Sequence, residues 1–501
     1  MLIENILGVH KRAPDILDCI SNLSSDEVFT PPSLAAQMLD QLPPSVWANP
    51  DLKWLDPGCK SGVFLREAAI RLMKGLSDEF PDESERRSHI FQNMLHGIAI
   101  TELTANISRR SVYYTKNANG KYAVVKFEDA AGNIVYRRSS HKYVAGKCAT
   151  CGSPDALDAP ERDGLENYAY TFIHEEDVFD VKFDVIIGNP PYQLEDGGYG
   201  ASAAPIYQLF VEQAKKLDPK YLSFVIPARW FTDGKGLDGF RNEMINDRRI
   251  SHLVDYPKLY DLFPGVKIRG GVCYFLWQRD YEGDCEVKTI VDGEVLSSMK
   301  RDLRIGGDVL VRDNRAVSIL EKVRSRGYET LDKNVSARKP FNLPTNFANF
   351  KTKPFAGSLK LYGNHFTGFV KESEITKNNH LIPKYKVLVP KAGGGEGRFP
   401  DTAIAKPILI GPDEVCTETY LVVGAFDRKK DAERHLQYLS SRFARFLISL
   451  RKNTPQLSQD KFKFVPLLPL NQELNDEYLY DLFELSDAEQ QFIASMITAK
   501  P

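Results

Sequence analysis

The sequence contains no long hydrophobic segment and few cysteines, and both absences narrow the class of protein. No apolar run approaches the roughly 20 residues of a membrane-spanning helix, and the N-terminus lacks the apolar core of a signal peptide. The seven cysteines are an odd number scattered over 501 residues, which does not fit a disulfide framework. No internal repeat or low-complexity tract is visible. We therefore expect a cytoplasmic protein of two or three domains, without membrane contact.

A large net charge is also absent, but the total of −2 hides an uneven distribution. Residues 331–470 contain 23 Lys and Arg against 12 Asp and Glu, a net charge of +11. Residues 471–501 carry −6 and the first 330 residues −7. A basic segment between two acidic ones is typical of a module that contacts nucleic acid, although Lys-rich loops on a soluble surface give the same count.

The most informative stretch is F-D-V-I-I-G-N-P-P-Y at residues 183–192. Its first five residues are apolar apart from one Asp, which predicts a buried parallel strand that the glycine and prolines then end. Open α/β sheets bind ligands at that end of a strand. Asn189 and the Pro190 carbonyl offer two adjacent acceptors that suit an exocyclic amine, and Tyr192 offers a ring on which a planar base can stack. The plain alternative is a strand end with a satisfied amide.

A second loop lies upstream in W-L-D-P-G-C-K-S-G-V-F-L, residues 54–65. The pattern predicts a short strand, a turn and a helix, because apolar residues recur at helical spacing after Gly62. Glycines let the backbone approach a nucleoside-like ligand closely, and Asp56 adds a carboxylate.

In this order the two stretches resemble the amino-methyltransferases that use S-adenosylmethionine, and more narrowly the γ-class adenine-N6 DNA methyltransferases of restriction–modification systems. The resemblance covers about residues 27–290 and extends more loosely to the C-terminus. It implies the catalytic residues Asn189, Pro190, Pro191 and Tyr192. It also implies a set of cofactor-binding residues: Phe29, Thr30, Pro31, Asp56, Pro57, Gly58, Cys59, Ser61, Gly62, Phe64, Glu102 and Asp177.

Several of these assignments depart from the family pattern. Family members often have a glycine where this chain has Lys60, so we expect binding with a different loop path. The acid that binds the ribose often stands at the position of Ala99, which leaves Glu102 as the nearest substitute, unless Glu102 is only a solvated helix start. Asp177 is one of three adjacent carboxylates. Thr30, from the family's Phe-Thr-Pro element, is also predicted to cap the helix that follows.

Residues 112–176 are expected to be an insertion, because 133 positions separate Asp56 from Asn189. Residues 122–127 and 134–136 predict a β-hairpin. A C-x-x-C-G knuckle follows and matches half of a zinc-ribbon site, and the segment contains only two histidines. The proposed ligands of a structural zinc ion are His141, Cys148, Cys151 and His174. Two free cysteines without a metal are the alternative.

The fold class expected from these patterns is α/β: a Rossmann-like methyltransferase sheet over residues 1–300, with the zinc-ribbon-like hairpin inserted. A helical connector (301–330), a basic α+β target-recognition domain (331–470) and an acidic helical tail (471–501) follow. The basic helix with Arg442, Arg445, Arg451 and Lys452 could contact DNA or belong to the core. Glu286 and Lys288 match half of a nuclease metal site, but alternation on an edge strand explains them better.

The resemblance implies transfer of a methyl group from S-adenosylmethionine to the N6 amine of an adenine flipped out of duplex DNA. A separate restriction endonuclease is a conceivable partner in a bacterial cell. The alternatives are methylation of RNA or of a protein glutamine, a bifunctional restriction–methylation enzyme, and an inactive specificity subunit, against which the intact N-P-P-Y argues.

Overall fold

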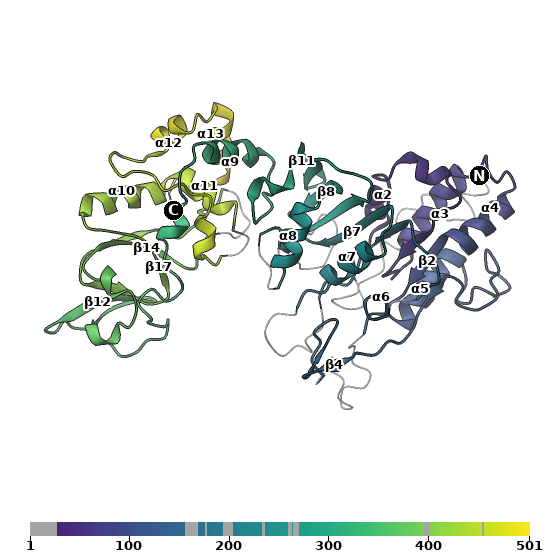
Figure 1. Cartoon of the computed structure of the whole chain (residues 1–501), viewed down its shortest axis with the longest axis horizontal. Coiled ribbons are helices and arrows are strands. Elements are labelled where there is room, and N and C mark those ends of the chain that lie inside the picture. Colours follow the sequence, from purple (N-terminus) through teal and green to yellow (C-terminus); the bar gives the residue numbers. More distant parts are fainter. Residues whose placement is uncertain are drawn as a thin grey trace. The chain divides into compact units, whose positions relative to one another are not determined.

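The computed structural model describes residues 28–155, 169–175, 178–193, 204–232, 236–258, 263, 270–394, 400–452 and 455–500. The chain divides into two compact units, Met1–Arg304 and Ile305–Pro501, both drawn in Figure 1. The sequence also predicts one or two short helices within residues 1–26 and a glycine-rich loop at residues 193–200; residues 1–27 and 194–200 lie outside the described residues. Among the described residues, no helix has the length and hydrophobicity that crossing a bilayer requires.

In the described part of the first unit, nine strands form one mixed sheet in the order β11-β10-β8-β9-β7-β6-β1-β2-β3. The strands are β1 (Trp54–Asp56), β2 (Leu95–Ile98), β3 (Ile134–Val135), β6 (Val185–Gly188), β7 (Tyr221–Pro227), β8 (Ile250–Tyr256), β9 (Val272–Gln278), β10 (Cys285–Val291) and β11 (Glu294–Arg301). The sheet confirms the predicted α/β class.

The strand predicted before the N-P-P-Y residues is confirmed as β6, in the middle of the sheet. It runs parallel to β1 and β7, and all four of its residues are buried. The sequence also predicts a late strand at residues 272–277 that pairs with residues 250–254, and the antiparallel ladder between β8 and β9 confirms it. The loops that follow β1 and β6 therefore emerge at the same edge of the sheet.

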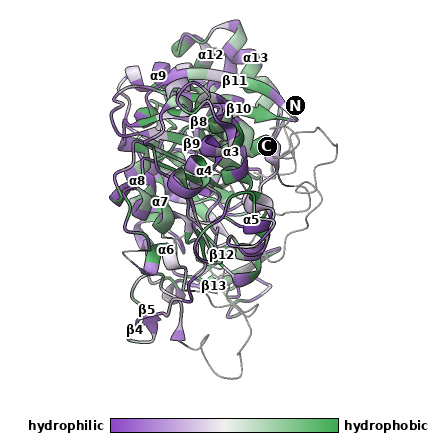
Figure 2. Cartoon of the chain, turned by 90° about the vertical axis from the view of Figure 1, so that its right-hand side faces the viewer, coloured by the Kyte–Doolittle hydropathy of each residue, from purple (hydrophilic) through white to green (hydrophobic). Residues whose placement is uncertain are grey.

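Helices cover the sheet and contribute to its hydrophobic core. Their bounds are α2 (Pro32–Leu39), α3 (Val63–Gly75), α4 (Glu83–His89), α5 (Glu102–Tyr113), α6 (Thr171–His174), α7 (Tyr207–Lys216) and α8 (Asp238–Asn246). Side chains of α2, α3 and α5 share one cluster with Val185 and Ile187 of β6, while α7 packs against β7. Figure 2 shows this pattern as hydrophobic colouring in the strands labelled β8 to β10 and hydrophilic colouring on helices such as α8.

The hairpin predicted for residues 122–136 is wrong. Residues 122–127 form no strand, and Ile134–Val135 is the edge strand β3, which pairs in parallel with β2. The described hairpin of the insertion is shorter and lies later, between β4 (Tyr143–Val144) and β5 (Lys147–Cys148). The apolar side chains of residues 124–127 pack on the main core instead of pairing as a strand.

The second unit contains three-stranded sheets and a helical layer. One sheet has the order β13-β12-β16 and the other β15-β14-β17. The strands are β12 (Ser358–Gly363), β13 (Phe366–Lys371), β14 (Tyr385–Pro390), β15 (Ile408–Ile410), β16 (Glu414–Cys416) and β17 (Tyr420–Phe426). The helices are α9 (Arg315–Ser325), α10 (Lys429–Ser440), α11 (Arg442–Ser449), α12 (Asp476–Leu482) and α13 (Asp487–Met496). One core contains side chains from α9, α11, α12 and α13, so the expected connector and tail pack with the segment between them.

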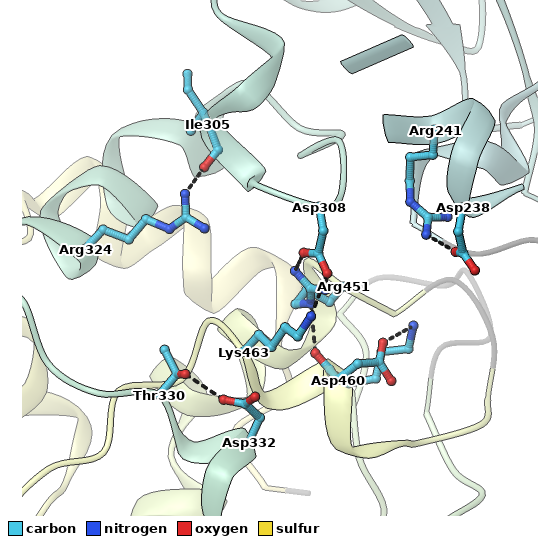
Figure 3. A network of polar contacts seen from close by, with 11 residues as sticks. Asp238, Arg241, Ile305, Asp308, Arg324, Thr330, Asp332, Arg451, Asp460 and Lys463 are labelled. Atoms are coloured by element: carbon cyan, nitrogen blue, oxygen red, sulfur yellow. Dashed lines mark hydrogen bonds and ion pairs between the residues drawn. The ribbon is translucent and has the colours of Figure 1, made fainter. Parts of the chain in front are cut away.

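The basic residues around α11 are mostly buried, which corrects the charge argument. Arg445 and Arg451 are 0% and 2% exposed. Arg451 forms a two-bond ion pair with Asp308 (2.7 and 3.0 Å), and Lys463 contacts the same carboxylate at 2.7 Å, as Figure 3 shows. The Lys452 ammonium donates to the carbonyls of Gly394 and Ala403. These cations hold the unit together, so the surface of residues 331–470 is less basic than the sequence count.

Candidate active site

The loop after β1 is shaped by glycines that leave no room for a side chain. A Cβ on Gly188 would lie 2.7 Å from Asp56 Oδ1, and one on Gly62, whose φ is +75°, would lie 2.7 Å from Ser108 Oγ. The backbone N–H of Gly58 donates to Asp56 Oδ1 at 3.1 Å. These contacts pack the loop against the end of β6 and against α5 (Glu102–Tyr113).

A pocket opens at this edge of the sheet, and its lining joins three segments that are far apart in the sequence. The lining residues are Thr30, Asp56, Gly58, Lys60, Ser61, Gly62, Val63, Phe64 and Asn189. The structure thus brings together six of the predicted cofactor-binding residues and the predicted catalytic amide. Cys59 lies behind this lining: it is fully buried, and a Cβ on Gly97 would lie 2.7 Å from its Sγ.

The side chain of Asn189 has a fixed orientation. Its Nδ2 donates to the Val28 carbonyl and to Thr30 Oγ1, each at 3.1 Å. Because the Val28 carbonyl can only accept, the NH2 group must face it. The other side-chain atom, Oδ1, is buried and has no hydrogen-bond partner among the described residues. An unpaired buried acceptor is costly, and Asn189 belongs to the pocket lining, so a ligand with an N–H donor would satisfy it.

The prediction that Thr30 caps α2 is wrong. Pro31 occupies the N-cap position and no side chain caps the helix. The Thr30 hydroxyl accepts a hydrogen bond from Asn189 Nδ2 instead, so this residue positions the predicted catalytic amide and also lines the pocket. Phe29 is buried beside it.

Asp56 and Lys60 form the charged part of the site. Burial raises the pKa of Asp56 to about 7, although the Gly58 N–H and the Lys60 charge act in the opposite direction. The Lys60 side chain is 4% exposed, and its Nζ donates to the Val28 carbonyl at 3.2 Å. From the sequence, Lys60 is expected only to change the path of the loop, because it departs from the family pattern. A lysine within a loop of otherwise small and apolar residues was the signal that could have identified it.

The rest of the N-P-P-Y segment is buried at the end of β6. The Tyr192 ring is 6% exposed, and its hydroxyl has no hydrogen-bond partner among the described residues. Burial raises the pKa of Tyr192 well above its ordinary value, so the hydroxyl stays neutral. The Tyr192 carbonyl accepts from the N–H of Ile206, which ties this segment to the start of α7.

The two predicted acidic ligands of the cofactor are less well placed. Glu102 is the exposed first residue of α5, after the N-cap Thr101. It follows β2, the neighbour of β1, so it lies at the correct edge of the sheet but does not line the pocket. Asp177 lies outside the described residues.

Within the described residues, the predicted metal ligands His141, Cys148, Cys151 and His174 converge. Their nearest ligand atoms all lie within 4.8 Å of one another. Cys148 Sγ is 3.6 Å from His174 Nε2, and Cys151 Sγ is 3.5 Å from His141 Nδ1. Two thiols and two imidazoles at these distances match the donor set of a tetrahedral zinc site.

A mixed sheet whose adjacent parallel strands β1 and β6 end in a glycine loop and an N-P-P-Y segment defines the class of nitrogen-directed methyltransferases. Residues 93–263 match the family described as Eco57I restriction-modification methylase. An uncharacterized adenine-specific methylase of Mycoplasma pneumoniae is 34% identical over 386 residues, which cover 70% of this chain and 90% of that protein. The chain therefore belongs to the adenine-specific methylases of the restriction–modification type.

Solved structures with a similar fold are larger than this chain. One is the Type IIL restriction-modification enzyme MmeI in complex with DNA, with 13% identity and a TM-score of 0.44 over 86% of this chain and 64% of that one. Another is a nuclease-deletion mutant of the Type ISP restriction-modification enzyme LlaGI with a DNA substrate mimic. It has 15% identity and a TM-score of 0.47 over 87% of this chain and 46% of that one.

Proposed function

We propose that this protein transfers a methyl group from S-adenosylmethionine to the N6 amine of an adenine flipped out of duplex DNA. The observation that carries the proposal is the Asn189 amide, whose NH2 group is held by two acceptors while Oδ1 is buried without a partner. Membership of the adenine-specific methylases supports the choice of base.

Asn189 Oδ1 and the Pro190 carbonyl would accept the two protons of the exocyclic amine. These hydrogen bonds draw the nitrogen toward tetrahedral geometry and stabilise the positive charge that develops on it. Because the Asn189 amide is held by Val28 and Thr30 before the base arrives, its orientation does not have to be set during the reaction. Tyr192 would stack on the flipped base, which requires its buried ring to become accessible.

The pocket in front of Asp56 would bind the cofactor. When bound, S-adenosylmethionine supplies a methyl group on a positively charged sulfur. Gly58 and Gly62 let the loop pack tightly against Asn189 and α5, and Asp56 in the pocket lining offers a carboxylate to a cationic ligand. The pocket is small in this structure, so it would widen to admit the cofactor. We also propose that the bound cofactor is surrounded by Phe29, Pro31, Pro57, Glu102 and Asp177.

The cluster of two cysteines and two histidines would hold one structural zinc ion. The cluster lies at the hairpin of β4 and β5, whose strands are two residues long each, and a hairpin of this size is not stable without further support. A metal supplies that support by joining the hairpin to α6 through His174. Metal analysis of the purified protein should find one zinc ion per chain, none in Cys148→Ser/Cys151→Ser, and an unchanged amount in the control Cys285→Ala.

The second unit would read the DNA sequence, with residues 331–470 as the recognition domain. Their net charge of +11 supports this role, although part of that charge is buried. A separate endonuclease partner is part of the same proposal, because restriction–modification systems pair methylation with cleavage.

The test is methyl transfer from labelled S-adenosylmethionine to unmodified duplex DNA, with the modified positions mapped by sequencing. We expect N6-methyladenine at one short, defined sequence. Asn189→Ala should abolish transfer while it still binds the cofactor, and the exposed Asn119→Ala should behave like the unmodified protein. A folded, cofactor-binding protein that leaves DNA unmethylated would contradict the proposal, and RNA and protein substrates would then be tested.

A further inference from the structure

The hairpin between β4 and β5 carries a basic surface that the methyl-transfer site does not explain. Arg138, Lys142 and Lys147 are exposed, and none of them forms an ion pair with a described acidic residue. Residues 137–151 contain four basic residues and no acidic one. Arg137, the fourth, lies 3.9 Å from Glu175.

This hairpin is built to be rigid. Its turn residues Ala145 and Gly146 both have positive φ values, 51° and 78°, as in the two-residue turns that suit the twist of antiparallel strands. The Cys148 N–H donates to the Ser153 carbonyl at 2.8 Å, which folds the cysteine knuckle back on β5. The four converging metal ligands close the base of the hairpin. Lys142, next to β4, and Lys147 of β5 therefore project from a fixed support, and Arg138 lies on the segment that leads into the hairpin.

The hairpin is also linked to the site where the target base would bind. Its metal ligand His174 ends α6, and Phe172 of the same helix stacks on Phe210 of α7 with ring centroids 5.6 Å apart. The helix α7 starts next to Ile206, whose N–H donates to the Tyr192 carbonyl. Figure 1 shows β4 at the end of an arm that leaves this unit near α6. The contacts run from the hairpin to the N-P-P-Y segment within one compact unit.

We infer that the metal-supported hairpin is a second DNA contact, which binds phosphates of the duplex that carries the target adenine. The inference rests on the proposed function, because the duplex is the substrate. Three unpaired cations on a rigid support suit a polyanion, and phosphate contacts position a protein on DNA without reading its sequence. The hairpin would thus hold the duplex while the second unit reads it.

The experiment measures the affinity for a labelled duplex as a function of salt concentration, using the full chain. Each phosphate contact contributes about 0.9 to the slope of log K against log salt. In Arg138→Ala/Lys142→Ala/Lys147→Ala that slope should therefore fall by up to about 2.7, while the affinity for S-adenosylmethionine stays the same. The variant Lys142→Arg/Lys147→Arg should keep the slope of the unmodified protein.

The matched control is Lys116→Ala/Lys121→Ala/Lys126→Ala, which removes the same charge from exposed positions outside the hairpin. We expect its slope to stay within about one of the original value. Equal slopes in the two triple variants, or no change in the hairpin variant, would overturn the inference. Failure of the proposed function is a separate result, namely that the unmodified protein does not methylate DNA.

Discussion

Replacing Thr30 by valine tests whether the catalytic amide is held in place by its two acceptors. Valine has nearly the same shape but lacks the hydroxyl, so one N–H of Asn189 would lose its partner in a buried site. A buried N–H without a partner costs about 1–3 kcal/mol. If that cost falls on the orientation of the amide, the rate of methyl transfer should fall about 5- to 150-fold.

The assay is single-turnover methylation of duplex DNA at saturating cofactor and DNA, because Thr30 also lines the cofactor pocket. Saturation removes any loss of binding and leaves the rate of the chemical step. Thr30→Ser keeps the hydroxyl and should stay within about twofold of the unmodified enzyme. A normal rate for Thr30→Val, or an equal loss for Thr30→Ser, would refute the view that this hydroxyl orients Asn189.

Three further predictions concern charge, space and stability. Because the pKa of Asp56 is raised to about 7, the side chain is protonated below that pH and loses its negative charge. Calorimetry should therefore show about tenfold weaker binding of S-adenosylmethionine at pH 6 than at pH 8. The variant Asp56→Asn should bind the cofactor weakly at both pH values. Gly188→Ala should lower the free energy of unfolding by about 1–3 kcal/mol in chemical denaturation, because its Cβ would lie 2.7 Å from Asp56 Oδ1. The control Gly239→Ala, in helix α8 with no atom within 4 Å of its Cβ, should raise it by about 0.5–1 kcal/mol. Partial burial opposes the ionisation of Asp308, but hydrogen bonds from the two cations in Figure 3 outweigh it and hold its pKa below the ordinary 3.8. The stabilisation is therefore present above pH 3.8 and lost as the pH falls, so Asp308→Asn should lower the melting temperature at pH 7 and have a shrinking effect below about pH 4.

The strand before Asn189 and the loop at Asp56 could be predicted because their signals are local. A five-residue apolar run that ends in glycine and proline specifies a buried strand, and glycine spacing specifies a close turn. The convergence of the four proposed metal ligands could also be predicted, since few cysteines and histidines occur in their segment. These features needed no knowledge of which distant segments meet.

The errors have the opposite origin, because they depend on contacts between distant residues. Thr30 was assigned to the helix beside it, but its partner Asn189 lies 159 positions away. Residues 134–136 have the composition of a hairpin strand, and only the neighbouring β2 decides that they extend the main sheet. The cations Arg445 and Arg451 contribute to any count of charge, and burial alone shows that they face the protein interior.

The Val28 carbonyl explains how the cofactor loop and the catalytic segment depend on each other. It accepts from Lys60 Nζ, which comes from the loop after β1, and from Asn189 Nδ2, which comes from the end of β6. A carbonyl oxygen has two lone pairs, so these two donors can fill its capacity. Lys60 also acts on Asp56, whose pKa its charge lowers. A shift of the cofactor loop that withdraws Lys60 would therefore disturb the same carbonyl that orients the amide. The lysine that stands in place of a glycine thus gives the chain a direct connection between the two halves of its site.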